Sequence, residues 1–172
     1  PAAALELEDG TIITGKTTPL LGASSALLLN ALKTLAGLDD ELHLISPTVI
    51  EPIQKLKTEY LGSKNPRLHT DEVLIALSIC AATDENARLA LEQLPKLRGC
   101  QAHTSVMLST VDIKLFKRLD VQLTSEAKYE NKRIYLPCKQ NKRGKGTSCP
   151  DRRPLHPRRG NDELRNWDLW RS

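Results

Sequence analysis

Aromatic residues are scarce in this sequence, at 3% of its 172 residues, and no apolar run reaches membrane-spanning length. The longest apolar stretch, Leu20 to Leu38, is interrupted by Asn30 and Lys33 and falls short of the roughly 20 residues that a spanning helix needs. A core with so few large rings must be built from Leu, Ile, Val and Ala. We therefore expect a soluble, helix-rich domain and no membrane partner.

A secretory signal is also absent, and the chain begins at Pro1 rather than at Met. We expect a piece of a longer protein whose remainder precedes Pro1 and is its main partner, with a homo-oligomer as a further option. Cys80 lies in an apolar run and is interpreted as a small buried residue, so a disulfide framework is not indicated. The expected compartment is the cytoplasm.

Residues 1–136 lack an excess of positive charge, although the whole chain has a net charge of +4. They contain 15 Lys or Arg and 17 Asp or Glu, whereas residues 137–172 contain 10 and 4. Hydrophobic periodicity also ends near Tyr135, and the composition beyond it is typical of disordered chains. We predict an α/β domain over 1–136 and a disordered basic tail over 137–172. We interpret the tail as a product of a frameshift or read-through, the alternative being a nucleic-acid-binding arm.

Strand and helix patterns alternate along residues 1–136. Short β-branched or alternating runs predict strands at residues 11–14, 42–45, 101–108 and 121–124. Apolar periodicity and capping residues predict helices that begin at Pro19, at Pro47 with a kink at Pro52, at Asp71 after a Thr70 cap, at Asp84 after a Thr83 cap, and after a Ser109 cap. The order β-α-β-α-α-α-β-α-β predicts a small, at least partly parallel sheet with helices packed over its faces.

Residues 10–17, from Gly10 to Thr17, match the P-loop pattern G-x-x-x-x-G-K-[ST]. In a P-loop the helix already includes the Lys and the Thr, whereas here the intervening residues are themselves the predicted strand. Pro19 disfavours helical conformation at Thr18, so the helix should start at Pro19 with Thr18 as its cap. We interpret the match as accidental. An anion site formed by Lys16, Thr17 and the helix N-terminus remains an alternative.

Hydroxyl residues follow three of the predicted strands at the points where helices begin. If those strands are parallel, the hydroxyls gather along one edge of the sheet, where ligands of open α/β folds bind. Serine and threonine are also ordinary helix caps, which explains the same pattern without a ligand. The ligand-binding candidates are Lys16, Thr17, Thr18, Ser46 and Ser109.

The run His69-Thr70-Asp71-Glu72 is the densest cluster of residue types used in acid–base catalysis. His69, Asp71 and Glu72 are therefore the catalytic candidates, although acids at a helix N-terminus also complement the helix dipole without any catalytic role. A zinc deaminase requires H-x-E and P-C-x-x-C. This chain has H-x-D instead of H-x-E. The sequence that follows Pro137 and Cys138 has no cysteine at the position of the second cysteine of the motif.

Other zinc patterns are missing as well. No H-E-x-x-H occurs in the sequence, and Cys138, Cys149 and His156 do not have the spacing of common zinc ligands. We expect no metal site.

Three longer runs, at residues 15–26, 43–53 and 65–74, resemble the C-terminal part of a bacterial family, domain of unknown function 1846, also called uncharacterised protein family 0371. They are GKTTPLLGASSA, HLISP with IEPI, and NPRLHTDEVL, and the similarity covers about Leu7 to Tyr135. The resemblance implies the C-terminal subdomain of a much longer cytoplasmic protein, with a three-layer αβα sandwich similar in topology to cytidine deaminases. It implies no activity.

Three functional hypotheses follow. The first is a non-catalytic or half-site module that helps form a ligand crevice or a subunit contact in a larger protein. The second is an enzyme domain that binds a phosphate-bearing or carboxylate ligand at Lys16, Thr17 and helix N-termini, with His69 or Asp71 transferring a proton. The third is nucleic-acid binding through the basic tail.

Overall fold

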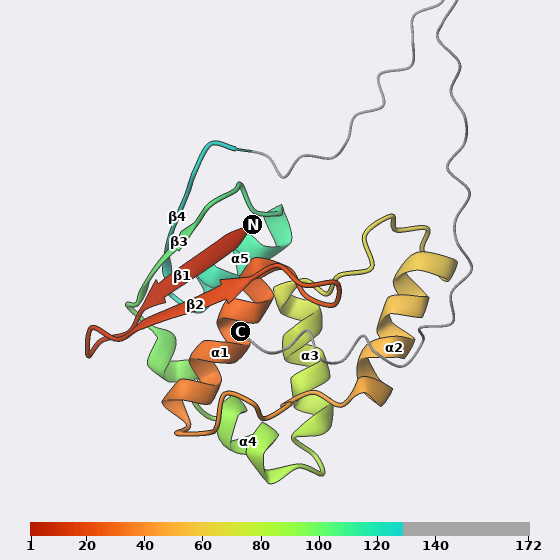
Figure 1. Ribbon diagram of the computed structural model, residues 1–172, viewed down its shortest axis with the longest axis horizontal. Coiled ribbons are helices and arrows are strands. Elements are labelled where there is room, and N and C mark those ends of the chain that lie inside the picture. Colours follow the sequence, from red (N-terminus) through yellow and green to blue (C-terminus); the bar gives the residue numbers. More distant parts are fainter. Residues whose placement is uncertain (129–172) are drawn as a thin grey trace, which may run out of the picture. The chain divides into compact units, whose positions relative to one another are not determined.

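The computed structural model describes residues 1–128, which form a mixed four-stranded sheet with helices against it (Figure 1). The strands are β1 (Ala2–Glu6), β2 (Ile12–Lys16), β3 (Gln101–Thr104) and β4 (Gln122–Ser125), in the spatial order β2-β1-β3-β4. Strand β1 is antiparallel to both of its neighbours, and β3 is parallel to β4. Strands β2, β3 and β4 therefore run in one direction, and their carboxyl ends lie at the same edge of the sheet.

Strand β1 occupies a central position that sequence patterns did not predict. Its run of three alanines has weak β-propensity, which is why the pattern indicated no strand. Leu5 is only 1% exposed and pairs with Ile13 of β2, while the other edge of β1 pairs with β3. Burial and pairing on both sides decide the conformation here, because β-propensity depends strongly on context.

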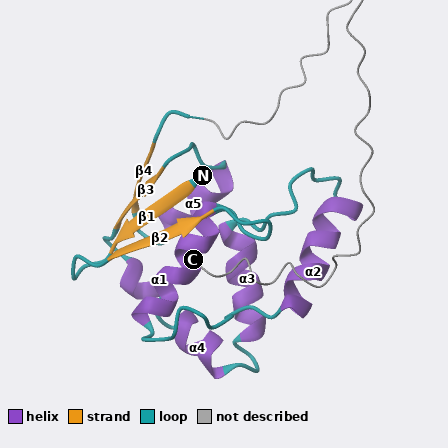
Figure 2. Cartoon of the chain, viewed as in Figure 1, coloured by secondary structure: helices purple, strands orange, loops and turns teal. Residues whose placement is uncertain are grey.

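The helices are α1 (Ala23–Leu35), α2 (Pro47–Lys55), α3 (Thr70–Cys80), α4 (Glu85–Leu91) and α5 (Thr110–Arg118), with a π-helical turn η1 (Leu56–Tyr60) and a 3₁₀ turn η2 (Leu94–Leu97). Helix α1 packs on β1 and β2, and α5 packs against β4 (Figure 2). Even the longest of these described helices has only 13 residues, too few to cross a membrane.

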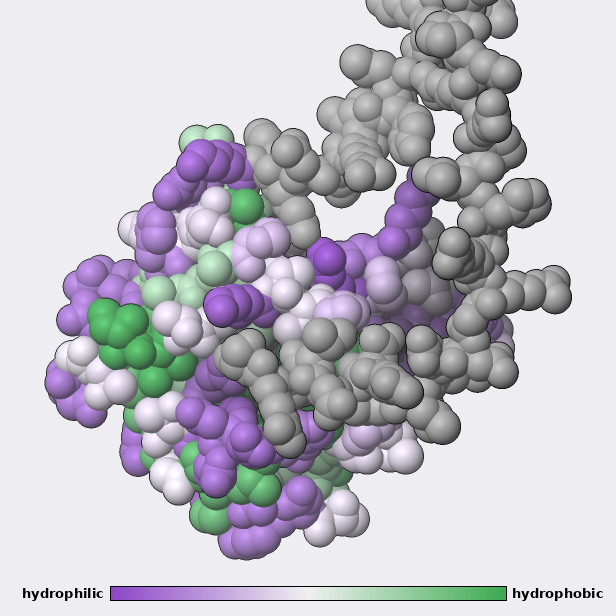
Figure 3. Space-filling model, viewed as in Figure 1, coloured by the Kyte–Doolittle hydropathy of each residue, from purple (hydrophilic) through white to green (hydrophobic). Residues whose placement is uncertain are grey.

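Residues alternate between buried and exposed along β1, β2 and β3, so the helices cover one face of the sheet. The α/β class and the partly parallel sheet are confirmed. Residues 1–128 supply two of the three layers that the family resemblance implies. Hydrophilic residues dominate the face of the domain seen in Figure 3, where a hydrophobic patch lies near the turn of the β1–β2 hairpin.

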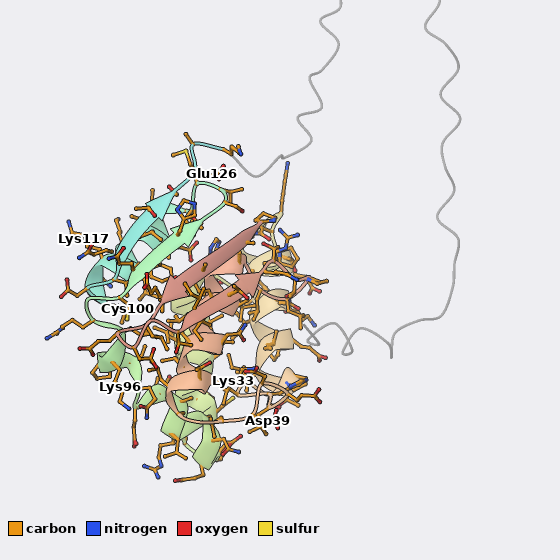
Figure 4. All side chains as sticks on the ribbon, turned by 60° about the vertical axis from the view of Figure 1, so that its left-hand side comes forward. Lys33, Asp39, Lys96, Cys100, Lys117 and Glu126 are labelled. Atoms are coloured by element: carbon orange, nitrogen blue, oxygen red, sulfur yellow. The ribbon has the colours of Figure 1, made fainter. Side chains whose placement is uncertain are left out.

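The predicted strand at residues 42–45 is wrong. Leu44 and Ile45 are buried, at 4% and 3% exposure, but they lie in an irregular connection between α1 and α2. A short apolar run indicates burial more reliably than it indicates a strand. Lys33 of α1 anchors this connection by donating to the Asp40 carbonyl, and Figure 4 shows Asp39 nearby on the same segment. Burial lowers the pKa of Lys33, against the opposing attraction of Asp40 and Asp39.

Three predicted helix starts are also wrong in detail. Helix α1 begins at Ala23 rather than at Pro19, and the residues that cap α3 and α4 are His69 and Asp84 instead of Thr70 and Thr83. The Thr70 hydroxyl is used for a contact with another helix, described below, and is not available as a cap. The predicted Ser109 cap of α5 is confirmed.

Gly15 explains part of the P-loop-like pattern in structural terms. A Cβ at this position would lie 2.3 Å from the Leu27 backbone nitrogen and 2.7 Å from the Ala23 carbonyl oxygen, both in α1. Only glycine allows β2 to approach the α1 backbone so closely. Gly10 has a φ of 82° in the β1–β2 turn, a conformation that also favours glycine. Both glycines of the pattern therefore have structural roles.

Candidate functional site

The start of α3 is held against the start of α1 by a short stretch of backbone pairing. Leu68 forms a parallel bridge with Leu21, and its N–H donates to the Leu20 carbonyl at 2.9 Å. The Leu68 carbonyl in turn accepts from the Ser25 hydroxyl at 2.9 Å. Because α1 follows β2, this pairing brings the residues before α3 to the carboxyl end of β2.

Asp112 connects the first turn of α5 to the first turn of α3. Its Oδ1 accepts from the Thr70 backbone N–H at 3.0 Å and from the Thr70 hydroxyl at 2.8 Å. Its Oδ2 accepts from the hydroxyl of Ser109, the α5 cap, at 2.7 Å. The side chain of Asp112 is 6% exposed, so the two helix starts meet at a buried carboxylate.

His69 contacts the same carboxylate from the N-cap position of α3. Its Nδ1 lies 3.3 Å from Asp112 Oδ2, and its side chain is 33% exposed. A carboxylate can only accept when ionised, so Nδ1 carries the proton of this contact. Nε2 is then the acceptor nitrogen of the neutral ring.

The two groups of this dyad have shifted pKa values. Burial acts to raise the pKa of Asp112, but hydrogen bonds from His69, Ser109 and Thr70 outweigh it and lower the pKa to about 2. The hydrogen bond to Asp112 raises the pKa of His69, with burial opposing it. Asp112 is therefore ionised at neutral pH, and it stabilises the protonated imidazole of His69.

A partly buried ion pair supports the dyad from the side of η1. Lys57 is 6% exposed, and its Nζ lies 2.6 Å from Glu72 Oε2 and donates also to the Arg67 carbonyl. Glu72 Oε2 accepts in addition from the His69 backbone N–H at 2.7 Å, which completes a capping box. The π-helical turn, closed by the Leu61 N–H and Leu56 carbonyl, brings Lys57 to this place, and such turns are frequent at functional sites.

The geometry favours acid–base chemistry over nucleophilic catalysis. In a catalytic triad the nucleophile is bonded to the histidine and the acid lies behind it. Here the Ser109 hydroxyl donates to Asp112, on the same oxygen that contacts His69. Ser109 therefore contacts the carboxylate and not the imidazole, and the His69 side chain is the more exposed member of the pair, at 33% against 6% for Asp112.

The structure brings only some of the predicted site residues together. Thr18 lies next to the site, because its carbonyl accepts from Arg67 Nε at 3.0 Å, two residues before His69. Its hydroxyl accepts the N–H groups of residues 20 and 21 in a turn and does not cap α1. Ser46 lies elsewhere, at the start of α2, with its hydroxyl 2.8 Å from that of Thr48.

The remaining predicted site residues lie at the end of β2 and in the first turn of α3. Lys16 is the exposed last residue of β2, and the next residue, Thr17, donates its N–H to the Pro1 carbonyl at 3.0 Å. Asp71 lies in the first turn of α3 and accepts from the Glu72 N–H at 2.9 Å. Asp71 thus complements the helix start, and the carboxylate that faces His69 is Asp112.

Asp112 and Lys57 are the site residues that sequence reasoning missed. Asp112 had a signal, because an acid three residues after the Ser109 cap is typical of a helix start, but nothing in the sequence connects it to His69, 43 residues earlier. Cys138, Cys149 and His156 lie outside the described residues. Within residues 1–128, no three His, Cys, Asp or Glu side chains are grouped so that they could hold a metal ion.

The fold and site define an α/β domain with a partly parallel sheet and a His–Asp pair that joins two helix starts. The chain belongs to the family described as domain of unknown function DUF1846, C-terminal, which matches residues 1–135. The similarity predicted from the three sequence runs is confirmed.

Curated relatives carry the name UPF0371 protein. The chain is 65% identical to the one from Corynebacterium aurimucosum over 132 residues, which cover 77% of this chain and 26% of that protein. It is 61% identical to the one from Corynebacterium diphtheriae, covering 78% and 27%, and 49% identical to one from Clostridium botulinum, covering 77% and 26%. The chain spans about a quarter of the length of these relatives, so the domain is the C-terminal part of a larger family protein.

Proposed function

We propose that the domain supplies a proton-transferring half-site to a ligand crevice of a longer protein. His69 contacts the ligand, and Asp112 positions and charges its imidazole. The observation that carries this proposal is the 3.3 Å contact between Nδ1 of the partly exposed His69 and Oδ2 of the buried Asp112. A buried carboxylate behind an accessible imidazole is the arrangement that a general acid or base needs.

The electrostatics favour an anionic ligand, either phosphate-bearing or carboxylate. A raised pKa keeps His69 protonated to higher pH than usual. The N-terminus of α3 adds a positive dipole end at the same residue, and the Arg67 guanidinium lies two positions earlier. Of the acids near His69, Glu72 is paired with Lys57, Asp112 accepts four hydrogen bonds, and Asp71 accepts the Glu72 N–H.

The site is proposed as a half-site because this chain covers about a quarter of its relatives. His69 and Asp112 come from two helix starts on one side of the domain. Further ligand contacts would come from the polypeptide that the chain does not span.

Calorimetric titration tests this proposal, with inorganic phosphate, AMP and citrate as probes, on the full-length Corynebacterium aurimucosum relative in which residues 1–135 of this chain replace the matching part. His69→Gln in this protein should weaken binding of at least one probe tenfold or more. His103→Gln is the matched control, because His103 is an exposed histidine bonded to Thr124 at 2.9 Å. Lys16→Ala separates the anion site at the end of β2 from the His69 site.

Two results would contradict the proposal: no binding of any of the three probes, or binding that His69→Gln leaves unchanged. Loss of binding with Lys16→Ala alone would assign the ligand-binding site to the end of β2. In that case His69 and Asp112 would serve only to join α3 to α5.

A further inference from the structure

The most exposed apolar side chains of the domain gather on two neighbouring elements. Within residues 1–128, six large apolar side chains are at least half exposed, and five of them lie on η1, on the residue after it, or on α3. We name these five the η1–α3 surface: Leu56 (50%), Tyr60 (73%), Leu61 (71%), Ile75 (59%) and Ile79 (54%). The sixth, Ile12, lies on β2.

An ion pair joins the two elements that carry these side chains. Lys57, which follows Leu56, lies 2.6 Å from Glu72 of α3. Glu72, Ile75 and Ile79 follow one another at helical spacings of three and four residues, so they share one side of α3. The opposite side of α3, which includes Val73 and Leu77, is buried in the core. Figure 1 shows α2, which leads into η1, beside α3.

The composition of this surface is that of an interface. The described residues contain two aromatic side chains, and while Phe116 is fully buried, Tyr60 is the most exposed large apolar residue. Exposed tyrosine and aliphatic side chains on neighbouring elements are typical of protein contact sites. Their burial by a partner is favourable because it removes apolar surface from water.

We propose that the η1–α3 surface docks the polypeptide that precedes this domain in proteins of the family, through an apolar face on that polypeptide. The family match is to a C-terminal domain, and the relatives are about four times as long as the part that this chain covers. Contacts between domains of one chain commonly bury an apolar centre within a polar rim. Lys55 at the end of α2 and Glu59 of η1, paired at 3.9 Å, are exposed polar residues adjacent in sequence to Leu56 and Tyr60.

The test mixes the 172-residue chain with the remaining three quarters of the Corynebacterium aurimucosum relative and measures affinity by calorimetry. Tyr60→Ala and Ile75→Lys should each weaken binding at least tenfold, while Ile12→Lys, an equally exposed apolar residue away from the surface, should not. Unfolding midpoints of all three variants establish that each one folds. Equal affinities across the set would overturn the proposal.

A second measurement does not depend on the separated part folding alone. Cysteine placed at the position of Tyr60 should react with a maleimide at least tenfold more slowly in the full-length relative than in the 172-residue chain, and cysteine at the position of Ile12 should react equally in both. Equal rates at Tyr60 would overturn the proposal. So would self-association of the 172-residue chain that Ile75→Lys abolishes, because it would assign the surface to a second copy. The docking experiments contain no ligand, so their outcome does not depend on whether the proposed half-site binds one. Failure of the docking proposal can therefore be distinguished from failure of the half-site proposal.

Discussion

At the scale of single residues, Asp112 has a role that its position in the sequence hides. As a member of a capping box it would stabilise one helix by bonding to its own first turn. Its carboxylate instead accepts hydrogen bonds from His69, Thr70 and Ser109, and so holds the starts of α3 and α5 together. A buried carboxylate with this many donors is costly to protonate and costly to replace.

Asp112 should make the domain sensitive to acid. Its pKa falls from 3.8 in the unfolded chain to about 2 in the fold, so its contribution of about 2 kcal/mol is present above pH 3.8 and lost as the pH falls through about 2. The raised pKa of His69 affects stability at higher pH. The stabilisation that protonated His69 contributes is complete below pH 6.5 and is lost as the pH rises through the raised pKa. Between these limits both groups are charged and the pair contributes most.

Urea unfolding of the wild type and of Asp112→Asn checks this expectation. The loss of stability in Asp112→Asn should be about 2 kcal/mol at pH 6 and clearly smaller at pH 3. Asp120→Asn is the matched control, because the Asp120 side chain is 73% exposed and lies 3.9 Å from Arg98. A loss that is the same at both pH values would show that folding does not lower the pKa of Asp112.

At the scale of elements, close backbone contact decides where α1 and β2 lie. Strand β2 contacts α1 closely at Gly15. If Gly15 had a Cβ, the nearest atoms would be backbone atoms of α1, which cannot rotate away as a side chain could. Gly22, the cap of α1, has a φ of −70° and its nearest heavy atoms are 3.9 Å away. Two glycines seven residues apart thus differ in how much a side chain would cost.

Gly15→Ala should destabilise the domain by about 2 kcal/mol or more, since either α1 or β2 must move to admit the methyl group. Gly22→Ala should cost less than about 1 kcal/mol, the usual difference between these residues at a helix cap. Thermal or urea unfolding followed by circular dichroism measures both. If Gly15→Ala is as mild as Gly22→Ala, the approach of β2 to α1 is looser than the structure shows, and the P-loop-like pattern needs another explanation.

At the scale of the whole molecule, stability and charge are carried by different parts of the chain. The buried core of the described residues runs from Ala3 to Val121, and residues 1–136 have nearly balanced charge. The excess of positive charge lies in residues 137–172, outside the described residues. We propose that these residues do not contribute to the fold of the domain.

Removal of residues 137–172 should therefore change the thermal midpoint by less than about 4 °C, the shift that 1 kcal/mol produces in a domain of this size. Differential scanning calorimetry of the 172-residue chain and of residues 1–136 measures it, and a larger loss would show that the basic residues stabilise the domain. The same two chains address the nucleic-acid alternative. That role requires salt-sensitive DNA binding by the longer chain only.

Much of the fold follows from local sequence signals. The predicted strand at residues 11–14 corresponds to β2, the predicted start at Pro47 to α2, and the predicted Ser109 cap to α5. These features depend on β-branched runs, proline geometry and capping side chains, which act over a few residues. The family resemblance depends on longer runs, and it too can be recognised from the residues alone.

The sequence by itself determined the α/β class, most helices and the shortlist that contained His69 and Ser109. Tertiary structure alone decided that β1 is a strand, that residues 42–45 are not, and that Asp112 lies beside His69. The physical reason is that those outcomes depend on partners far along the chain, as when Asp112 meets Thr70 across 42 residues. A run of alanines becomes a central strand, and a capping aspartate becomes half of a buried dyad, only when neighbours supply the hydrogen bonds and exclude the water.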